Sequence, residues 1–286
     1  MSVPAAGLPH PVVGGAFGSP VPPGTGWPGD PATADTPVCH DPAQVRATAE
    51  AADDLPGLDA AVSVCQACHR LVAWREGVAR TKRASFAQEP YWGRPIGGWG
   101  SATPAALIVG LAPAANGGNR TGRIFTGDRS GDWLFASLHR VGLATQETSV
   151  HAGDGQRLVN TRMAAAVRCA PPDNKPTVEE RDACAPWLVR EVSLVTPSLR
   201  AVVCLGSYAW DAALRTFRSI GYDVPRPKPR FGHAAEAVLT SPRGQEVTVL
   251  GSYHPSQQNT FTGKLTEPML DAVLARAAEL GRAVEH

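Results

Sequence analysis

Residues 105–128 of this 286-residue chain read AALIVGLAPAANGGNRTGRIFTGD, a short apolar run followed by a long segment of glycine and small polar residues. A second stretch, HPSQQNTFTG at residues 254–263, follows the apolar run 247–250 in the same way. A rigid strand that ends in such a segment brings a close-fitting loop to a ligand. The two stretches therefore predict a binding site built from loops at the ends of two strands.

Apolar runs alternate with amphipathic segments along the rest of the chain. We expect strands at residues 107–109, 164–167, 199–205 and 246–250, and helices from Pro42 onward and at residues 58–72, 132–141, 177–195, 208–217 and 266–280. Such alternation is typical of an α/β fold, in which helices cover both faces of a parallel sheet. Ligands bind such sheets at the carboxyl ends of the strands, where both glycine-rich stretches fall.

The composition limits the partners and the compartment. A net charge of +1 gives no overall attraction to nucleic acid, so any surface that binds anions must be local. We find no run of about 18 apolar residues and expect no membrane span. The N-terminus has no Lys or Arg ahead of an apolar stretch, so we expect no secretory signal and a cytoplasmic protein.

The first 40 residues are rich in proline and glycine and carry almost no charge. A segment of this composition buries too little apolar surface to offset its ordering entropy. We therefore expect residues 1–40 to form a flexible tail, with Trp27 as a candidate for docking on the body. Residues 41–286 are expected to form a single domain.

Four cysteines have the spacing of metal ligands. Cys65 and Cys68 form a C-x2-C pair, and Cys169 and Cys184 form a C-x14-C pair about a hundred residues later. On the predicted helix 58–72, the three-residue spacing places the first two thiols on one face. Two distant pairs can converge into a four-thiolate site for zinc or for an iron–sulfur cluster, and the spacing does not separate the two. Unligated core thiols are the competing interpretation.

The two loop stretches and the four cysteines together resemble the uracil-DNA glycosylase superfamily, and specifically its family 5 (type B) iron–sulfur branch of bacteria and archaea. The resemblance covers roughly residues 58–280. It implies a three-layer α/β/α sandwich with a short central parallel sheet, and a [4Fe–4S] cluster held by Cys65, Cys68, Cys169 and Cys184. It also implies hydrolysis of the glycosidic bond of uracil in DNA, and often of other deaminated bases such as hypoxanthine, which leaves an abasic site.

The resemblance and the chemistry of this reaction assign two catalytic residues. The base must be flipped out of the duplex, and its departure leaves negative charge on the base and positive charge on the sugar. A carboxylate that positions water and a donor near the base oxygen are then useful. We expect Asp128 to position the water, although an Asp at this place also suits a helix cap. We expect His254 to donate to the base oxygen, although a lone histidine is more often structural.

Further residues, of the first loop and of the segment 169–176, are expected to bind the base. Phe125 is a candidate for stacking on the base, with a core position as the alternative. Asn174 is expected to pair with the uracil edge, with ordinary turn chemistry as the alternative. Ala114 and Asn116 are expected to line the same site. The family commonly has histidine in place of Asn116, and asparagine keeps the hydrogen bonding but not the titration.

The DNA surface is expected to be local and basic. We expect Arg120 and Arg123 to contact phosphates, which makes binding salt-dependent. Gln257, Gln258 and Asn259 are expected to enter the duplex or fill the vacated space. The expected protein is a monomer that acts on damaged DNA at the bacterial nucleoid. The alternatives are a relative specific for another lesion and a catalytically idle DNA-binding protein that uses the metal as a staple.

Overall fold

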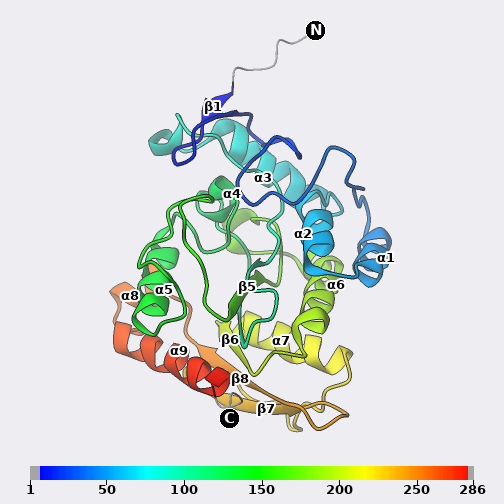
Figure 1. Ribbon diagram of the computed structural model, residues 1–286, viewed down its shortest axis with the longest axis vertical. Helices are drawn as coiled ribbons and strands as arrows, with labels where there is room; N and C mark the ends of the chain where they lie inside the picture. The colour runs from blue at the N-terminus through cyan, green and yellow to red at the C-terminus, as the bar shows by residue number, and fades with distance from the viewer. Residues whose placement is uncertain (1–6, 283–286) are drawn as a thin grey trace.

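The computed structural model describes residues 7–282, and its centre is a six-stranded mixed sheet (Figure 1). The strand order is β3-β5-β4-β6-β8-β7. The strands are β3 (Trp99–Gly100), β4 (Ala106–Gly110), β5 (Thr161–Ala165), β6 (Ala201–Leu205), β7 (Glu236–Thr240) and β8 (Glu246–Ser252). The four central strands run parallel, as predicted, whereas the edge strands β3 and β7 are antiparallel. The sequence analysis did not predict either edge strand.

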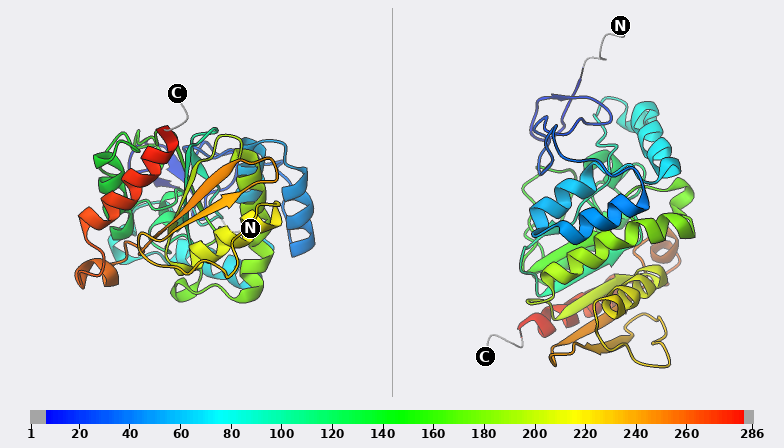
Figure 2. Two further views of the ribbon diagram at one scale, coloured as in Figure 1. Left: turned by 90° about the horizontal axis from the view of Figure 1, so that it is seen from below. Right: turned by 90° about the vertical axis from the view of Figure 1, so that its right-hand side faces the viewer.

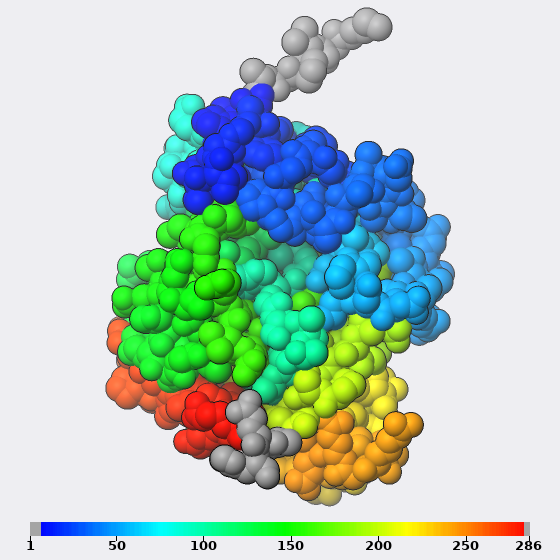
Figure 3. All heavy atoms as spheres, in the orientation of Figure 1, coloured from blue at the N-terminus to red at the C-terminus, as the bar shows by residue number. Residues whose placement is uncertain are grey.

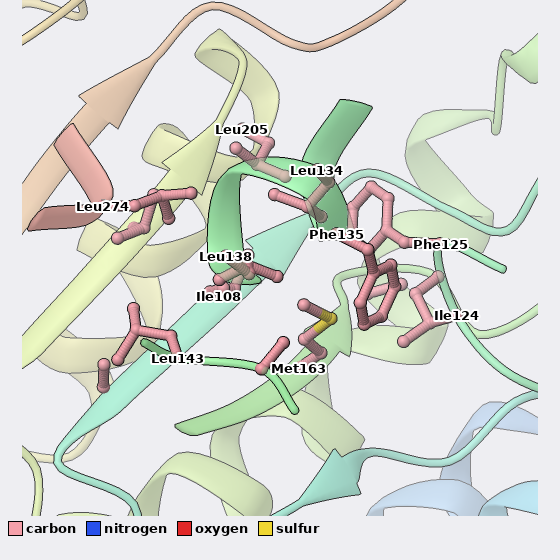
Figure 4. Close-up of a cluster of buried hydrophobic side chains, with 14 of the residues drawn as sticks. Ile108, Ile124, Phe125, Leu134, Phe135, Leu138, Leu143, Met163, Leu205 and Leu274 are labelled. Carbon is pink, nitrogen blue, oxygen red and sulfur yellow. The ribbon is translucent and has the colours of Figure 1, made fainter. Parts of the chain in front are cut away.

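Helices cover both faces of the sheet. The helices α5 (Arg129–Arg140) and α9 (Glu267–Arg282) pack on one face, and α6 (Val178–Val195) and α7 (Ser207–Ser219) pack on the other (Figures 1 and 2). Side chains of β4 alternate between the two cores: Ile108 belongs to the cluster drawn in Figure 4, and Leu107 belongs to the opposite one. The expected three-layer α/β/α sandwich is therefore confirmed.

The remaining elements are short or lie outside these layers. They are β1 (Leu8–Pro9), β2 (Ala16–Phe17), α1 (Pro42–Ala51), α2 (Leu55–Ser63), α3 (His69–Thr81), η1 (Ala84–Phe86), α4 (Gly118–Thr121), η2 (Pro172–Asn174) and α8 (Gln257–Phe261). Across the described range 7–282, no helix is both long enough and apolar enough to cross a membrane.

One predicted helix is wrong and one is confirmed in detail. The predicted helix 58–72 is two helices, because α2 ends at Ser63 and α3 begins at His69. The α6 helix begins with the capping box that the sequence contains, in which Thr177 and Glu180 each accept from the other's backbone N–H.

The segment before α1 is packed against the body, contrary to the prediction of a flexible tail. In Figure 3 it lies across one end of the molecule (dark blue), and Val21 and Trp27 are buried. The Val21 N–H donates to the Trp92 carbonyl, and Asp30 forms an ion pair with Arg94 at 2.7 Å. A few apolar anchors and one buried ion pair hold a segment whose average composition predicts disorder. Residues 1–6 of the predicted tail lie outside the described residues.

Two buried histidines join this segment to the body. The rings of His10 and His151 lie 4.3 Å apart, and the Trp27 ring packs on both. The backbone N–H groups of Val12 and Val13 donate to His10 Nδ1. Burial lowers the pKa of His151 to about 3, so its imidazole is neutral at neutral pH.

Candidate active site

A cavity of about 260 Å³ lies at the carboxyl ends of the parallel strands. Its walls come from the loops that follow β4, β5 and β8. The lining residues are Leu111, Ala112, Pro113, Ala114, Ile124, Phe125, Asp128, Ser130, Asn174, His254 and Ser256. Five residues predicted from sequence for the site therefore share one cavity: Ala114, Phe125, Asp128, Asn174 and His254.

The cavity adjoins a wider hollow of about 1010 Å³, which we call the mouth. Ala114, Asp128, Ser130 and Asn174 line both spaces. Asn116 lines the mouth but not the smaller cavity. The smaller space is below the usual range for a drug-sized ligand and suits a single flat ring, whereas the mouth is large enough for a longer group.

The backbone is strained at two residues that line the cavity and at Asp173, which lines the mouth. Phe125, Asp173 and Asn174 have φ values of 52°, 52° and 56°, in the left-handed region that side chains rarely adopt. Such outliers gather at functional sites because the surrounding structure must hold them there. Phe125 and Asn174 thus reach the cavity from two different loops.

Phe125 is buried, in the core position that the sequence left as the alternative. Its ring belongs to the apolar cluster of Figure 4 and also lines the cavity, 6.2 Å from the His254 ring. A Cβ at Gly110 would lie 2.5 Å from Phe125 Cζ, so only glycine leaves room for the ring at the end of β4. Core packing and a cavity wall are therefore both roles of this residue.

Asp128 caps a helix with one carboxylate oxygen and keeps the other apart. Its Oδ1 accepts from the Gly131 N–H at 2.9 Å and so caps α5. Its Oδ2 lies against Gly117, where any Cβ would overlap it. Burial raises the pKa of Asp128, and the N–H groups of Gly131 and Ser130 oppose this increase. The two alternatives from sequence, cap and cavity carboxylate, thus fit the same residue.

His254 is neutral because it is buried. Burial lowers its pKa to about 4, so the imidazole carries one N–H at neutral pH and can donate without being charged. The Asn259 amide donates to the His254 carbonyl at 2.8 Å and fixes the start of this loop. Asn259 therefore supports the loop from within, and its contact with DNA stays a prediction.

Tyr91, a buried residue that the sequence analysis missed, orients Asn116. The Tyr91 hydroxyl accepts from the Arg83 backbone N–H at 3.4 Å and donates to Asn116 Oδ1 at 2.9 Å. This arrangement leaves the Asn116 Nδ2 donors to face the mouth. Tyr91 lies 25 residues before its partner, so only the fold reveals the pairing.

The two arginines predicted to contact phosphates are buried structural residues. Arg120 is 5% exposed and pairs with Glu89 at 2.6 Å, and its guanidinium also donates to the carbonyls of Asn116 and Gly127. Arg123, also 5% exposed, pairs with Asp154 at 2.5 Å. Both guanidinium groups hold the glycine-rich loop in shape, and neither is free for DNA.

Other residues present charge and aromatic surface at the mouth. Arg83 and Arg129 line it, are exposed, and form no ion pair with any residue in the range 7–282. Trp74 on α3 also lines it and is 39% exposed. Gln257 lines the mouth from α8, Gln258 is exposed beside it, and Phe261 at the end of α8 is 70% exposed. Exposed side chains at the edge of a site leave no periodic signal in a sequence.

The four cysteines line one small internal cavity. Cys65 lies between α2 and α3 and Cys68 precedes α3, so the prediction that both share a helix face is wrong. Burial raises the pKa of Cys65 to about 12 and those of Cys68 and Cys169 to about 11. No three Cys, His, Asp or Glu side chains of residues 7–282 are grouped so as to hold a single metal ion.

The surroundings of this cavity fit an anionic metal centre. Arg168 lines it, and the Arg168 backbone N–H donates to Cys184 Sγ at 3.3 Å. The Arg75 guanidinium opposes the effect of burial on the pKa of Cys169. Four thiols with adjoining buried cations form a donor set that suits thiolate ligation.

Comparison with known proteins agrees with this geometry. The family model described as the uracil DNA glycosylase superfamily matches residues 98–278. A type-5 uracil-DNA glycosylase of Mycobacterium tuberculosis is 56% identical over 271 residues, 95% of this chain and 98% of that protein. One from Thermus thermophilus is 47% identical over 77% of this chain and 94% of that protein. The chain therefore belongs to the uracil-DNA glycosylase superfamily, in its type-5 branch.

Proposed function

We propose that this protein is a monofunctional glycosylase that hydrolyses the bond between deoxyribose and uracil in DNA and leaves an abasic site. The observation that carries the proposal is the convergence of Phe125, Asp128, Asn174 and His254 on one cavity of about 260 Å³. The type-5 uracil-DNA glycosylase relatives support the choice of uracil as the base.

The reaction begins with extrusion of the nucleotide, because the glycosidic bond is inaccessible inside the duplex. The flipped base enters the cavity, stacks on Phe125 and pairs its edge with the Asn174 amide. Asp128 uses its second oxygen to hold the attacking water, while its first remains on the α5 cap. As the bond breaks, the neutral His254 donates to the base oxygen that gains negative charge.

The mouth receives the DNA backbone around the flipped nucleotide. Arg83 and Arg129 provide phosphate contacts, and the Asn116 amide donates to an oxygen of the sugar–phosphate chain. The exposed α8 residues Gln257, Gln258 and Phe261 enter the space that the base leaves. Binding through few phosphate contacts agrees with a net charge of +1.

Cys65, Cys68, Cys169 and Cys184 would hold a [4Fe–4S] cluster, for which the shared cavity and the adjoining arginines are the support. When bound, the cluster joins the segment between α2 and α3 to the loop after β5 and to α6. No substrate atom needs its redox chemistry. Zinc at the same cysteines is the alternative, and a brown protein with iron and sulfide distinguishes the two.

A labelled duplex with one uracil tests the proposed activity. We expect cleavage at the uracil alone after alkaline treatment, and none in a matched duplex with cytosine. A duplex with hypoxanthine in the same position tests the wider substrate range. Binding of the uracil duplex without release of the base, by protein with full metal content, would favour the idle DNA-binding alternative. Light scattering of the same sample tests the expected monomer.

A further inference from the structure

Two buried arginines beside the cysteine cavity have donors without partners. Arg75 on α3 and Arg168 after β5 are each 1% exposed. Arg75 Nε, Arg168 Nε and Arg168 Nη1 are buried and have no hydrogen-bond partner within residues 7–282. A buried donor without an acceptor costs about 1–3 kcal/mol, and more when the group is charged. Such donors indicate an acceptor that the polypeptide itself does not supply.

The positions of the two side chains show where that acceptor lies. Arg168 lines the cavity of the four cysteines and is the neighbour of Cys169. Arg75 donates through Nη2 to the Cys65 carbonyl at 3.2 Å, and it interacts with the Cys169 thiol. The Arg168 guanidinium also opposes the effect of burial on the pKa of Cys184, so both buried cations act on cysteine sulfur atoms.

The other contacts of the two arginines are with carboxylates and backbone carbonyls. Arg168 Nη2 pairs with the fully buried Glu191, which also accepts from Arg162 Nε at 2.5 Å. Arg162 in turn pairs with Asp59 at 2.6 Å, so two cations and two carboxylates balance in this network. Arg75 Nη1 donates to the Gly93 carbonyl at 2.6 Å and lies 3.7 Å from Glu76. None of these contacts uses the three free donors.

We propose that Arg75 and Arg168 donate to the sulfur atoms of the cluster and stabilise its reduced form. The inference rests on the proposed [4Fe–4S] cluster. With four thiolates, the cluster gains one more negative charge when it takes up an electron. Nearby cations and N–H donors stabilise that form more than the oxidised one, so they raise the reduction potential. The two arginines are positioning and tuning residues, and they do not contact the base.

Redox titration of single variants tests this assignment. Arg168→Gln and Arg75→Gln each remove the charge and keep a polar side chain. We expect each variant to favour the oxidised cluster about tenfold more than the unaltered protein, a fall of about 59 mV for one electron. Arg162→Gln is the matched control, because Arg162 belongs to the same buried network but does not line the cysteine cavity. The control is expected to keep the original potential.

A measurement on the unaltered protein covers variants that fail to fold. Protein labelled with ¹⁵N only at the guanidinium nitrogens of arginine, and not at the Arg168 backbone nitrogen that bonds Cys184, is reduced, and pulsed electron paramagnetic resonance then detects nitrogen near the cluster spins. We expect coupling to arginine ¹⁵N. Variants with full iron content and unchanged potential would overturn the proposal, and so would a spectrum without arginine coupling. Colourless protein that releases uracil would overturn the cluster and this inference, but not the proposed glycosylase.

Discussion

Asp128 caps α5, and we propose that it also positions the attacking water; two substitutions separate these two roles. Asn caps helices about as well as Asp, so Asp128→Asn keeps the bond from the Gly131 N–H to the side chain. Asp128→Ala removes that bond, at a cost of about 1 kcal/mol in the free energy of unfolding. For a chain of this size this corresponds to a fall of about 2–4 °C in Tm.

The charge at Asp128 affects stability in the opposite direction. Burial raises its pKa in the folded protein above the value in the unfolded chain. A raised carboxyl pKa means that the folded state disfavours the charged form, so the ionised group reduces stability at neutral pH. Asp128→Asn removes this effect, and we expect its Tm to equal or exceed that of the unaltered protein.

Catalysis is expected to fail in both variants. Loss of a positioned base costs about 10²–10⁴ in rate, which is about 3–5 kcal/mol in the barrier. The assay is single-turnover release of uracil from a labelled duplex, with binding measured in parallel and Tm measured by calorimetry. If the Asp128→Asn protein releases uracil at a rate within threefold of the original, Asp128 does not position the water. A Tm several degrees lower in this variant would refute the structural separation.

Three further predictions follow from the site and its surroundings. Gly117→Ala places a Cβ against Asp128 Oδ2, and a displacement of this carboxylate by about 1 Å should lower the single-turnover rate about 10²-fold. Gly77→Ala, whose added Cβ meets no atom within 4 Å, is the control that should retain the rate. Arg129→Gln should weaken DNA binding and reduce the slope of log K against log salt by about 0.9, and an unchanged slope would contradict the proposed phosphate contact. Arg123→Gln should instead lower Tm, because it breaks the buried ion pair with Asp154. Burial depresses the pKa of His151 from about 6.5 in the unfolded chain to about 3, so the free energy of unfolding should fall as pH decreases below 6.5, by about 1.4 kcal/mol per pH unit. Urea unfolding between pH 7 and 5 should show a shallower decline of this free energy for His151→Gln.

The sequence predicted the features that depend on neighbouring residues. The strand at residues 107–109 is apolar throughout because both faces of a central parallel strand are buried. The capping box of Thr177 and Glu180 is local, so a span of four residues suffices to recognise it. Asp128 and His254 were selected from the family resemblance and the chemistry of the reaction, and each lies in a loop after a strand, where parallel strands bring such loops to one edge of the sheet.

The errors concern contacts between distant segments. Arg120 and Arg123 have the sequence environment of phosphate ligands, but their carboxylate partners lie 31 residues away in each case. The composition of residues 1–40 predicts disorder, yet Trp27 and the pair of Asp30 and Arg94 anchor this segment, because a few strong contacts outweigh an average. The orphaned donors of Arg75 and Arg168 are visible only in three dimensions.

The structure of the Asp128→Asn protein bound to a duplex with a single uracil tests most directly whether the cavity at the strand ends is the base pocket. We expect the uracil to lie inside the 260 Å³ cavity, stacked on Phe125, with Asn174 and His254 within hydrogen-bond distance of its edge. A uracil that stays in the duplex, or that binds elsewhere on the protein, would contradict the proposed mechanism.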